Sequence, residues 1–516
     1  MKNFSKNLRK NLWKYLCLIS LAITIALGTL HLFRSDLFYE TDIARDMLLL
    51  EDMMVNRKLM LIGARSSIPG VFHGPLYYWL AFPFFAFSGG NPVVVSYFWL
   101  AIYWSFLAAF YYTGKKIFNQ KFASVSTALI ASLTAFVPAG FTHTTVSNFI
   151  IVPLIYLVYR YLQSNKVRWL AAAVITTGLI IQFQMAFGVP VLILIGGFSV
   201  YQIIKRRQFK HLLTIFLILL PLSTFLAFDL RHDFMQTRSA IAYLGENNSG
   251  SINGFWHDRW VSIVDCFSVS ATPSKIFSDS TSILTIIALG FLGYKSFRSK
   301  RTKGRSTLML VVLVALGFWV VTLPFQGNVW PPYYRTLYPV IAFALTYVLL
   351  NLIPKKIGVV VLVIILGSNL FFNVKEGLGY LRADLLNDEI HWKFYRQMAS
   401  DIVADSEGKE FGYFVFSPDQ YGYQGKYAMR YLVRKNSLAG ISYQKRPLTY
   451  LIIALNNANN PWANEEFWQA QQVKIEREAD RAWIYPSGYQ VRRFDLAENE
   501  ATISADPNLL DGIHFR

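Results

Sequence analysis

The sequence has few charged residues. Asp, Glu, Lys and Arg make up 16% of its 516 residues, whereas a soluble chain carries about 25%. The deficit is concentrated in apolar runs of roughly 17–22 residues that recur from Trp13 to Asn373, and runs of this length cross the hydrocarbon core of a bilayer. The scarcity of charge therefore argues against an ordinary soluble protein and predicts a polytopic α-helical membrane protein.

Cysteine is also scarce, with two residues in the whole chain. Cys17 lies in the first apolar run and Cys266 lies far away in the sequence, which excludes a disulfide framework. The histidines expected outside the membrane stand at no recognisable metal-ligand spacing; they are His73, His143, His232 and His257. We therefore predict no particular metal site and no firm cofactor, and the sequence leaves room for a divalent ion.

Basic residues, by contrast, are plentiful, and the formal net charge is +19. Many of them stand in short segments between the apolar runs, at 114–121, 205–211, 295–305 and 354–356. Short basic loops collect on the cytoplasmic side of a membrane, so this charge indicates topology and not a nucleic-acid partner. With a cytoplasmic N-terminus, all these loops fall inside if there are about eleven spans. The expected spans are 12–33, 92–113, 121–140, 146–163, 167–183, 186–204, 209–228, 281–297, 306–325, 333–351 and 355–373.

Residues 75–90, "PLYYWLAFPFFAFSGG", form one further apolar segment. The segment is short for a span and contains Pro75 and Pro83. Counting it as a span would move every later basic loop to the outside, against the usual charge pattern. We therefore expect it to be interfacial or re-entrant.

The chain divides by composition into residues 1–376 and 377–516. The first part is expected to be the catalytic membrane domain of a multi-pass inner (plasma) membrane protein, with outer loops at 34–91 and 229–280. The second part has many charges and no spanning run. Its stretches "EFGYFVFSPD" and "LTYLIIAL" predict strands, "QYGYQGKYAMRYLVRKN" and "NEEFWQAQQVKIERE" predict helices, and "RAWIYPSGYQVRRFDL" predicts two strands around a turn. We expect a small extracytoplasmic α/β domain.

The outer loop opens with "DLFYETDIARDMLL", residues 36–49, which is unusually charged for a segment beside an apolar run. On a helix, Asp42, Arg45 and Asp46 share one face, while Glu40 does not share the face of Asp42. A carboxylate held at the membrane surface can act as a general base towards a hydroxyl. The alternative is an ordinary juxtamembrane helix with solvated charges.

The order of motifs resembles the GT-C glycosyltransferases, in the family 39-like branch that contains protein O-mannosyltransferases and lipid A aminoarabinose transferases. The matching features are a helix, an outer loop with an acid just after it, "GPLYYWLAFP", "FNQKFASVSTALIASLTAFVP" and "SNFIIVP". Weaker matches are "QFQ", "FDLRHDF" and "YYRTLYP". The resemblance covers the layout of residues 12–373 and is most specific across 36–153.

This resemblance implies a membrane glycosyltransferase that moves a sugar, with inversion, from a polyprenyl-phosphate donor to an acceptor hydroxyl on the outer face. It also implies that an acid in the first outer loop is the base. Spacing to "LIG", residues 61–63, assigns that position to Asp42, whereas an alignment through "RDML" assigns it to Asp36. Glu40 and Asp46 are the other catalytic candidates.

Substrate-binding candidates come from four outer segments. The acceptor candidates are Arg65, His73, Tyr77 and Asn148, and the donor-phosphate candidates are Arg231, His232, Tyr334 and Arg335. Arginine suits phosphate because it can donate two parallel hydrogen bonds. The alternatives are that Asn148 only caps a helix and that the arginines only extend to the lipid headgroups.

The expected partners are a polyprenyl-phosphate sugar donor, membrane lipids and a lipid, glycan or protein acceptor. The Tyr-rich stretch "SPDQYGYQGKYAMRYL" is expected to help select that acceptor. Two other classes remain: a lipid or polysaccharide transporter or flippase, and a non-catalytic scaffold. A transporter predicts ionisable residues within the spans, and these are nearly absent from the sequence. A polysaccharide polymerase or ligase remains open within the enzyme class.

Overall fold

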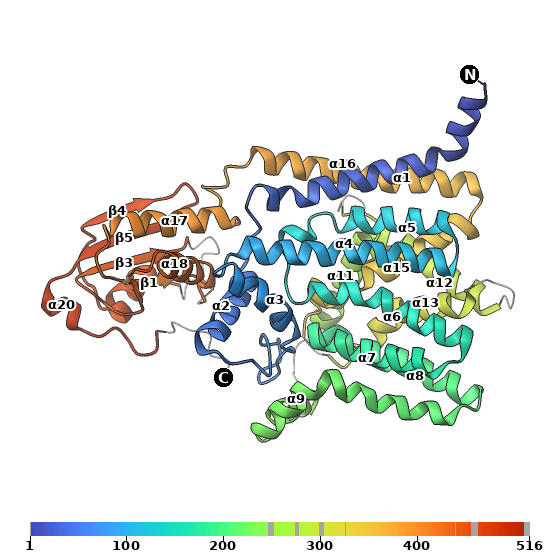
Figure 1. Ribbon diagram of the computed structural model, residues 1–516, viewed down its shortest axis with the longest axis horizontal. Coiled ribbons are helices and arrows are strands. Elements are labelled where there is room, and N and C mark those ends of the chain that lie inside the picture. Colours follow the sequence, from blue (N-terminus) through green and yellow to red (C-terminus); the bar gives the residue numbers. More distant parts are fainter. Residues whose placement is uncertain are drawn as a thin grey trace.

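The computed structural model describes residues 2–245, 252–273, 278–298, 304–325, 327–419, 421–438, 440–455 and 463–509. Two parts lie end to end along the long axis of the molecule (Figure 1): a bundle of apolar helices, and an α/β unit formed by the last part of the chain. Helices α2 (Thr41–Asn56) and α3 (Leu76–Phe87) lie where the two parts meet.

The bundle consists of the long apolar helices and their 3₁₀ and π extensions. These are α1 (Lys2–Phe33), α4 (Pro92–Ile117), α5 (Gln120–Leu133), α6 (Thr145–Ser164), α7 (Val167–Phe183), α8 (Met185–Lys205), η2 (Phe209–Ile218), α9 (Leu219–Arg231), α12 (Ser278–Arg298), α13 (Arg305–Val321), α15 (Leu337–Tyr347), η3 (Val348–Leu352) and α16 (Lys355–Arg382). An asparagine side chain caps the N-terminus of two of these helices. Asn91 accepts a hydrogen bond from the Val93 amide at 3.0 Å, and Asn119 accepts one from the Phe122 amide at 2.9 Å, which satisfies amides that lack a partner within the helix.

Seven of the predicted spans fall on segments that are long and apolar enough to cross a membrane. These are Tyr15–Phe33, Pro92–Ile117, Thr145–Ser164, Met185–Lys205, Phe209–Arg231, Ser278–Arg298 and Lys355–Arg382. The other four fall on shorter helices, namely α5, α7, α13, and α15 with η3, so the total of eleven stays a prediction. Helix α5 ends at Leu133, before the predicted end at residue 140, and the chain then turns into η1 (Val137–Ala139) at Pro138.

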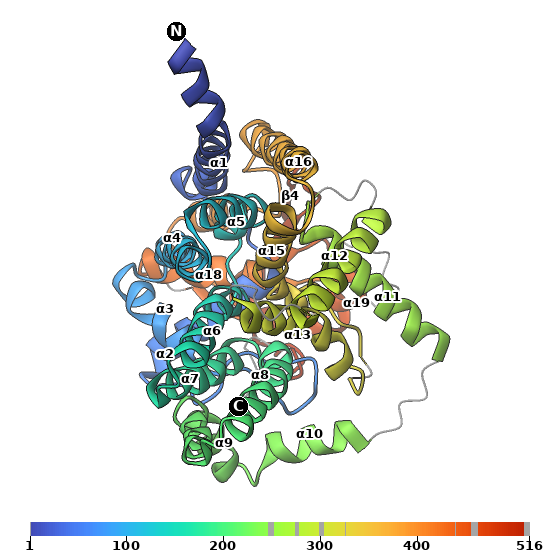
Figure 2. The same ribbon diagram turned by 90° about the vertical axis from the view of Figure 1, so that its right-hand side faces the viewer.

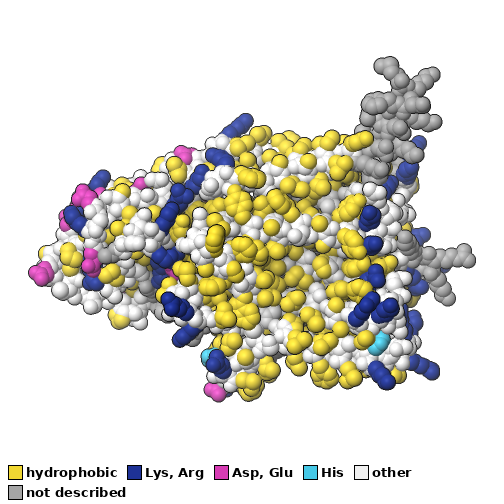
Figure 3. Space-filling view, viewed as in Figure 1, with side chains coloured by type: hydrophobic (Ala, Val, Ile, Leu, Met, Phe, Trp, Pro, Cys, Tyr) yellow, Lys and Arg dark blue, Asp and Glu magenta, His cyan; other side chains and the backbone are white. Residues whose placement is uncertain are grey.

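The surface of the bundle agrees with a membrane protein. A broad hydrophobic band lies between two rows of Lys and Arg side chains (Figure 3). One row lies at the end of the bundle that also holds the N-terminus, and the other lies at the junction with the α/β unit. Apolar side chains that face lipid and basic side chains at headgroup level would give this pattern.

The segments predicted to lie outside the membrane contain more helix than the sequence indicated. The segment 75–90 forms the short helix α3, in keeping with an interfacial segment. The loop predicted over 229–280 contains α10 (Met235–Gly245) and α11 (Ile252–Val269), and the short α14 (Pro331–Tyr334) precedes α15. Helix α11 packs against α12 and α15. Viewed along the bundle, α10 lies at its edge and α1 and α16 lie side by side (Figure 2).

The α/β unit is built on a five-stranded sheet of order β2-β1-β3-β5-β4. Its strands are β1 (Phe411–Phe416), β2 (Gly440–Ser442), β3 (Leu448–Ile453), β4 (Arg481–Ile484) and β5 (Gln490–Asp495). Strand β1 pairs in parallel with β2 and β3, and β5 pairs antiparallel with β3 and β4. Four of these strands lie in the predicted stretches, and β2 was not predicted.

Both faces of the sheet are covered, so β1 and β3 are buried along their whole length. Helices α17 (Trp392–Asp405) and α18 (Tyr423–Lys435) pack together, and their apolar side chains join the core of one face. Trp468 and Val473, from the π segment η4 (Trp468–Val473) after α19 (Glu465–Phe467), pack on the other. A last short helix, α20 (Glu498–Thr502), follows β5.

Two buried carboxylates attach the α/β unit to the bundle. Asp36, just beyond α1, lies 2.7 Å from His391 Nδ1 and accepts a hydrogen bond from the Lys393 amide at 3.1 Å. Glu51, on α2, forms ion pairs with Arg434 and, at 3.6 Å, with Arg430. Because removal of either partner leaves a buried charge unpaired, these contacts fix the unit over α2.

Candidate active site at the end of the bundle

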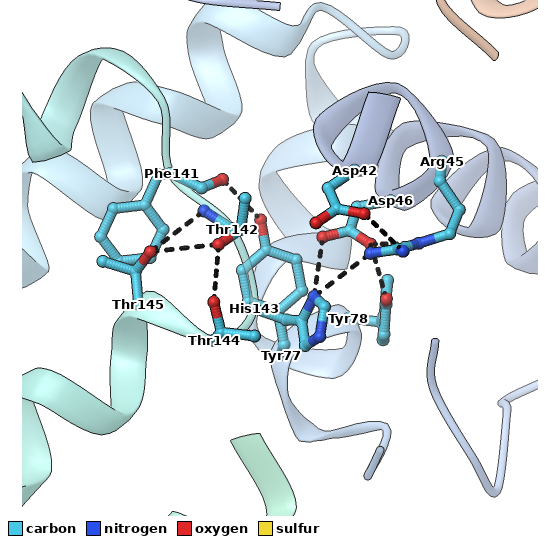
Figure 4. Close-up of polar contacts among 10 residues, drawn as sticks. All are labelled: Asp42, Arg45, Asp46, Tyr77, Tyr78, Phe141, Thr142, His143, Thr144 and Thr145. Atoms are coloured by element: carbon cyan, nitrogen blue, oxygen red, sulfur yellow. Dashed lines mark hydrogen bonds and ion pairs between the residues drawn. The ribbon is translucent and has the colours of Figure 1, made fainter. Parts of the chain in front are cut away.

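Helix α2 presents its charges as one connected group. Arg45 donates to Asp42 at 2.7 Å and to Asp46 at 3.0 Å, so the shared helix face predicted from the sequence is present. These side chains lie opposite the loop that carries His143 (Figure 4). Asp42 is half exposed, and no hydrogen bond to its second oxygen, Oδ2, is found among the described residues. That oxygen is free to accept a proton or a substrate hydroxyl.

Asp46, in contrast, is fully buried, and its carboxylate has several polar partners. Besides Arg45, its carboxylate accepts a hydrogen bond from Tyr78 at 2.7 Å and lies 3.4 Å from His143 Nδ1. Burial alone would raise the pKa of Asp46, but the charges of Arg45 and His143 and the hydrogen bonds from His143 and Tyr78 lower it to about 2. Asp46 is therefore ionised at neutral pH and holds Arg45 in place.

Two histidine rings pack against each other behind this group, tilted by 55°. The rings of His73 and His143 lie 4.8 Å apart, and both side chains are buried. Burial, followed by the charges of His143 and Arg45, lowers the pKa of His73 well below its usual value, which makes His73 a neutral imidazole. His143 was not among the predicted site residues, and its contact with Asp46 spans 97 residues of sequence.

A large polar cavity opens beside the start of α2. It has a volume of about 700 Å³, within the range of ligand sites. Its polar lining residues are Glu40, Thr134, Thr142, Thr145, Asn148, Asp258, Ser262, Asp265, Asn328, Tyr334, Arg335, Tyr338 and Asn373. Four sequence-predicted residues from three separate segments meet in this wall: Glu40, Asn148, Tyr334 and Arg335.

Asn148 is held in this wall by hydroxyl groups. Thr336 donates to its Oδ1 at 2.7 Å, and Ser147 lies 2.7 Å from the same threonine hydroxyl. Since Asn148 is the fourth residue of α6 and no helix-capping hydrogen bond is found for its side chain, the structure does not support the capping alternative. Its amide group is left to face the cavity.

The residues that line this cavity include one cation, Arg335, among several acids. Tyr334 donates to Asp265 at 2.6 Å. Arg335 is exposed to the cavity, and no ion pair of its guanidinium is found in the described part of the chain. Arg335 is thus available to an anionic group of a ligand.

An apolar cavity adjoins the polar one and shares Val329 with it. It has a volume of about 480 Å³. Its wall is largely aliphatic and aromatic and includes Ile68, Val71, Met185, Val189, Pro190, Ile193, Phe318, Val321, Phe325 and Tyr333, together with His73. Asp42 lines neither cavity, but it lies within electrostatic range of Tyr333 in the wall of the apolar one.

The structure does not bring every predicted residue to the cavities. Arg231 and His232 are exposed at the end of α9 and line neither cavity. Tyr77 is buried and stacks on Trp99 with ring centroids 4.7 Å apart. Arg65 is exposed and lines neither cavity.

The rival base Asp36 also lies away from solvent. Its carboxylate is buried and taken by His391 and Lys393, which favours the alignment through Asp42. Among the residues that the structure describes, no group of three or more His, Cys, Asp and Glu is arranged to hold a metal ion.

No family model matches the chain, and no curated protein matches its sequence. Among solved structures it is similar to ArnT from Cupriavidus metallidurans bound to undecaprenyl phosphate, with a TM-score of 0.57 and 12% identity over 95% of this chain and 99% of that one. The apo form of ArnT gives a TM-score of 0.54 and 12% identity over 96% and 99% of the two chains. The apo oligosaccharyltransferase of Archaeoglobus fulgidus gives 0.45 and 12% identity over 81% and 64%. The chain is therefore a polytopic helical membrane protein with the GT-C fold of ArnT, as the resemblance in its sequence implied.

Proposed function

We propose that this protein is a membrane glycosyltransferase that transfers a sugar from a polyprenyl-phosphate donor to an acceptor hydroxyl at the outer face. The observation that carries the proposal is the polar cavity, where Glu40, Asn148 and Arg335 meet beside the half-exposed Asp42. The similar structure of ArnT holds undecaprenyl phosphate, and the apolar cavity next to this site suits the hydrocarbon of such a lipid.

In the proposed reaction Asp42 is the general base. It accepts the proton of the acceptor hydroxyl while the acceptor oxygen bonds to the anomeric carbon. The bond from that carbon to the phosphate oxygen breaks on the opposite side, which inverts the configuration and releases the polyprenyl phosphate. Arg335 stabilises the charge that develops on the leaving phosphate.

Asp42 suits this step better than Glu40. Arg45 donates a hydrogen bond to one oxygen of Asp42, and Asp46 holds Arg45 in place. No hydrogen bond to the second oxygen of Asp42 is found among the described residues. Glu40 lines the cavity, but no polar partner that would orient its carboxylate is found among the described residues. A base must be held within hydrogen-bond reach of its proton, so we assign Glu40 to contacts with the substrate.

Replacing Arg335 by Gln should weaken the binding of undecaprenyl phosphate by about tenfold, because a charge-assisted contact to phosphate is lost. The measurement is a titration of the purified protein with undecaprenyl phosphate in detergent. Arg238→Gln is the matched control, since Arg238 is exposed on α10 and lines neither cavity. A loss on Arg231→Gln together with full binding by Arg335→Gln would place the phosphate at the end of α9 instead.

The α/β unit supplies a surface for the acceptor beside α2. The rings of Tyr421 and Tyr423 stack with centroids 5.1 Å apart, and Tyr421 is 54% exposed. Asp419 accepts hydrogen bonds from the Tyr421 amide at 2.9 Å and from Thr41, the first residue of α2, at 3.2 Å. The stacked rings are thereby fixed close to Asp42, where the face of a sugar ring on the acceptor can pack on Tyr421.

Replacing Tyr421 by Ala should raise the KM for the acceptor about fivefold and leave kcat nearly unchanged, because an aromatic contact of roughly 1 kcal/mol is lost from both ground and transition states. Tyr421→Phe keeps the ring and should behave as the parent. Steady-state transfer assays with varied acceptor measure this split. An unchanged KM would leave the α/β unit as a structural cover only.

The transporter alternative predicts buried ionisable groups along the spans. The buried Asp, Glu, Lys and Arg side chains in the described chain are Asp36, Asp46, Glu51, Asp229, Arg259, Lys426 and Lys445. All but Asp229 lie outside the bundle helices, and Asp229 lies at the outer end of α9, where it accepts hydrogen bonds from the first residues of α10. His31 is also buried, in α1, but it stands two residues before the end of that helix at Phe33. This distribution favours chemistry at one face over passage through the bundle.

A further inference from the structure

A third hollow, the basic pocket, lies where the outer ends of α1 and α16 meet α17. It has a volume of about 340 Å³ and is lined by Arg34, Ala383, Asp384, Leu385, Leu386, Lys393, Arg396 and Gln397. The candidate spans on α1 and α16 end at Phe33 and Arg382, immediately before the first lining residues. The pocket thus lies directly beyond the end of the α1 span, whereas α16 continues to Arg382 past the predicted end of its own span at residue 373.

The charges that line this pocket are unbalanced. Three are cations, and Asp384 is the only carboxylate among its lining residues. Asp384 already accepts hydrogen bonds from the Asn387 side chain at 2.6 Å and the Leu386 amide at 3.2 Å. No ion pair with a carboxylate is found for Arg34, Lys393 or Arg396 in the described residues. With three cations against one carboxylate the lining is net positive, so an anion in the pocket would be stabilised.

Parts of the wall are fixed before any ligand binds. Arg34 donates to the Tyr380 carbonyl at 3.1 Å, and its guanidinium lies 5.1 Å from the centre of the Tyr380 ring. The Lys393 amide donates to the buried Asp36. Arg396 follows Lys393 by three residues on α17, so their side chains lie on one face. The Arg34 side chain and the backbone of α17 are thus fixed before a ligand binds, and the side chains of Lys393 and Arg396 are what binding would have to order.

The surroundings of the pocket are apolar and exposed. Phe33 is 67% exposed, next to Arg34 in sequence, and Leu386 and Ile390 are 46% and 49% exposed. Exposed apolar side chains beside cations are typical of the boundary between headgroups and acyl chains. The basic row at the junction of bundle and α/β unit is visible at this level of the molecule (Figure 3).

We propose that the basic pocket binds a phosphate group, supplied by the headgroup of an anionic membrane lipid. The site shares no lining residue with the polar cavity, and the proposal does not depend on the glycosyltransferase activity. The lipid is favoured over free phosphate as the source because the pocket lies directly beyond the end of the α1 span with exposed apolar side chains around it. A lipid held there would bridge the bundle and α17.

The test uses the full chain in nanodiscs of phosphatidylcholine, alone or doped with phosphatidylglycerol. A ligand that binds only the folded state raises its unfolding temperature. We expect phosphatidylglycerol to raise the unfolding temperature of the parent protein by at least about 2 °C. The double variant Lys393→Gln/Arg396→Gln should lose this increase while keeping the unfolding temperature of the parent in phosphatidylcholine. Lys393→Arg/Arg396→Lys should retain it.

The matched control is Lys409→Gln/Lys435→Gln, which removes two charges elsewhere in the α/β unit. It should keep the full increase. A parallel series adds inorganic phosphate to phosphatidylcholine nanodiscs: an equal increase there, lost in the double variant, would keep the phosphate site and overturn the lipid source. No increase in the parent under either condition, or an equal loss in the control, would overturn the site.

Discussion

Replacing Asp42 by Asn is expected to lower sugar transfer by at least about 100-fold, the usual contribution of a general base. The amide keeps the shape of the carboxylate and can still accept a hydrogen bond from Arg45, so the fold should persist. It cannot take the proton of the acceptor hydroxyl. The measurement compares transfer from a polyprenyl-phosphate sugar by purified variant and parent, together with binding of undecaprenyl phosphate, which should be unchanged.

The control for this variant lies on the same helix. Asp52→Asn makes the same substitution ten residues further along α2, about 15 Å away, and should retain the activity of the parent. Activity of Asp42→Asn above a tenth of the parent would rule out Asp42 as the base. If Glu40→Gln then abolished transfer, the base would be the carboxylate that lines the cavity.

Replacing Asp46 by Asn should destabilise the protein by about 3–5 kcal/mol, because it leaves Arg45 beside an uncharged partner in a buried site. Tyr78→Phe removes only one hydrogen bond to the same carboxylate and should cost about 1.5–3 kcal/mol. Denaturant unfolding of parent and variants in one detergent measures both. If Asp46→Asn unfolds at the same denaturant concentration as the parent, the buried group does not hold α2 in place.

The pH dependence of unfolding gives this prediction a second readout. The pKa of Asp46 is lowered from 3.8 to about 2 in the folded protein. A carboxylate with a lowered folded-state pKa contributes stability above its unfolded-state pKa. That contribution is lost as pH falls from about 4 to 2, and the slope should be smaller in Asp46→Asn.

Part of the candidate site could be predicted from the charge pattern near the N-terminus. Because side chains at i, i+3 and i+4 of a helix share a face, residues 42–46 predicted the common face of Asp42, Arg45 and Asp46, and the Asp42–Arg45 ion pair lies on it. The positions of Asn148 and Arg335 in one cavity could be expected only from the family resemblance, since no local pattern joins segments so far apart.

Other features near the site could not be predicted from local sequence patterns. His143 stands in a short polar turn, and only the tertiary fold brings it to Asp46. Arg231 ends an apolar helix just as a phosphate-binding arginine would, yet it lies outside both cavities. Helices α10 and α11 lack the long apolar run that identifies a span, so the sequence predicted only a loop there.

The two buried carboxylates that attach the α/β unit to the bundle also limit the order in which the protein can fold. Asp36 is bound by the Lys393 amide, 357 residues later in the chain, and Glu51 by Arg434, 383 residues later. N-terminal parts of a chain fold first during synthesis. Both carboxylates therefore lack these partners until the last quarter of the polypeptide is synthesised. A ribosome that stops before residue 434 therefore releases a chain in which Glu51 lacks Arg434, although the contacts among Asp42, Arg45 and Asp46 lie within α2 and can already form.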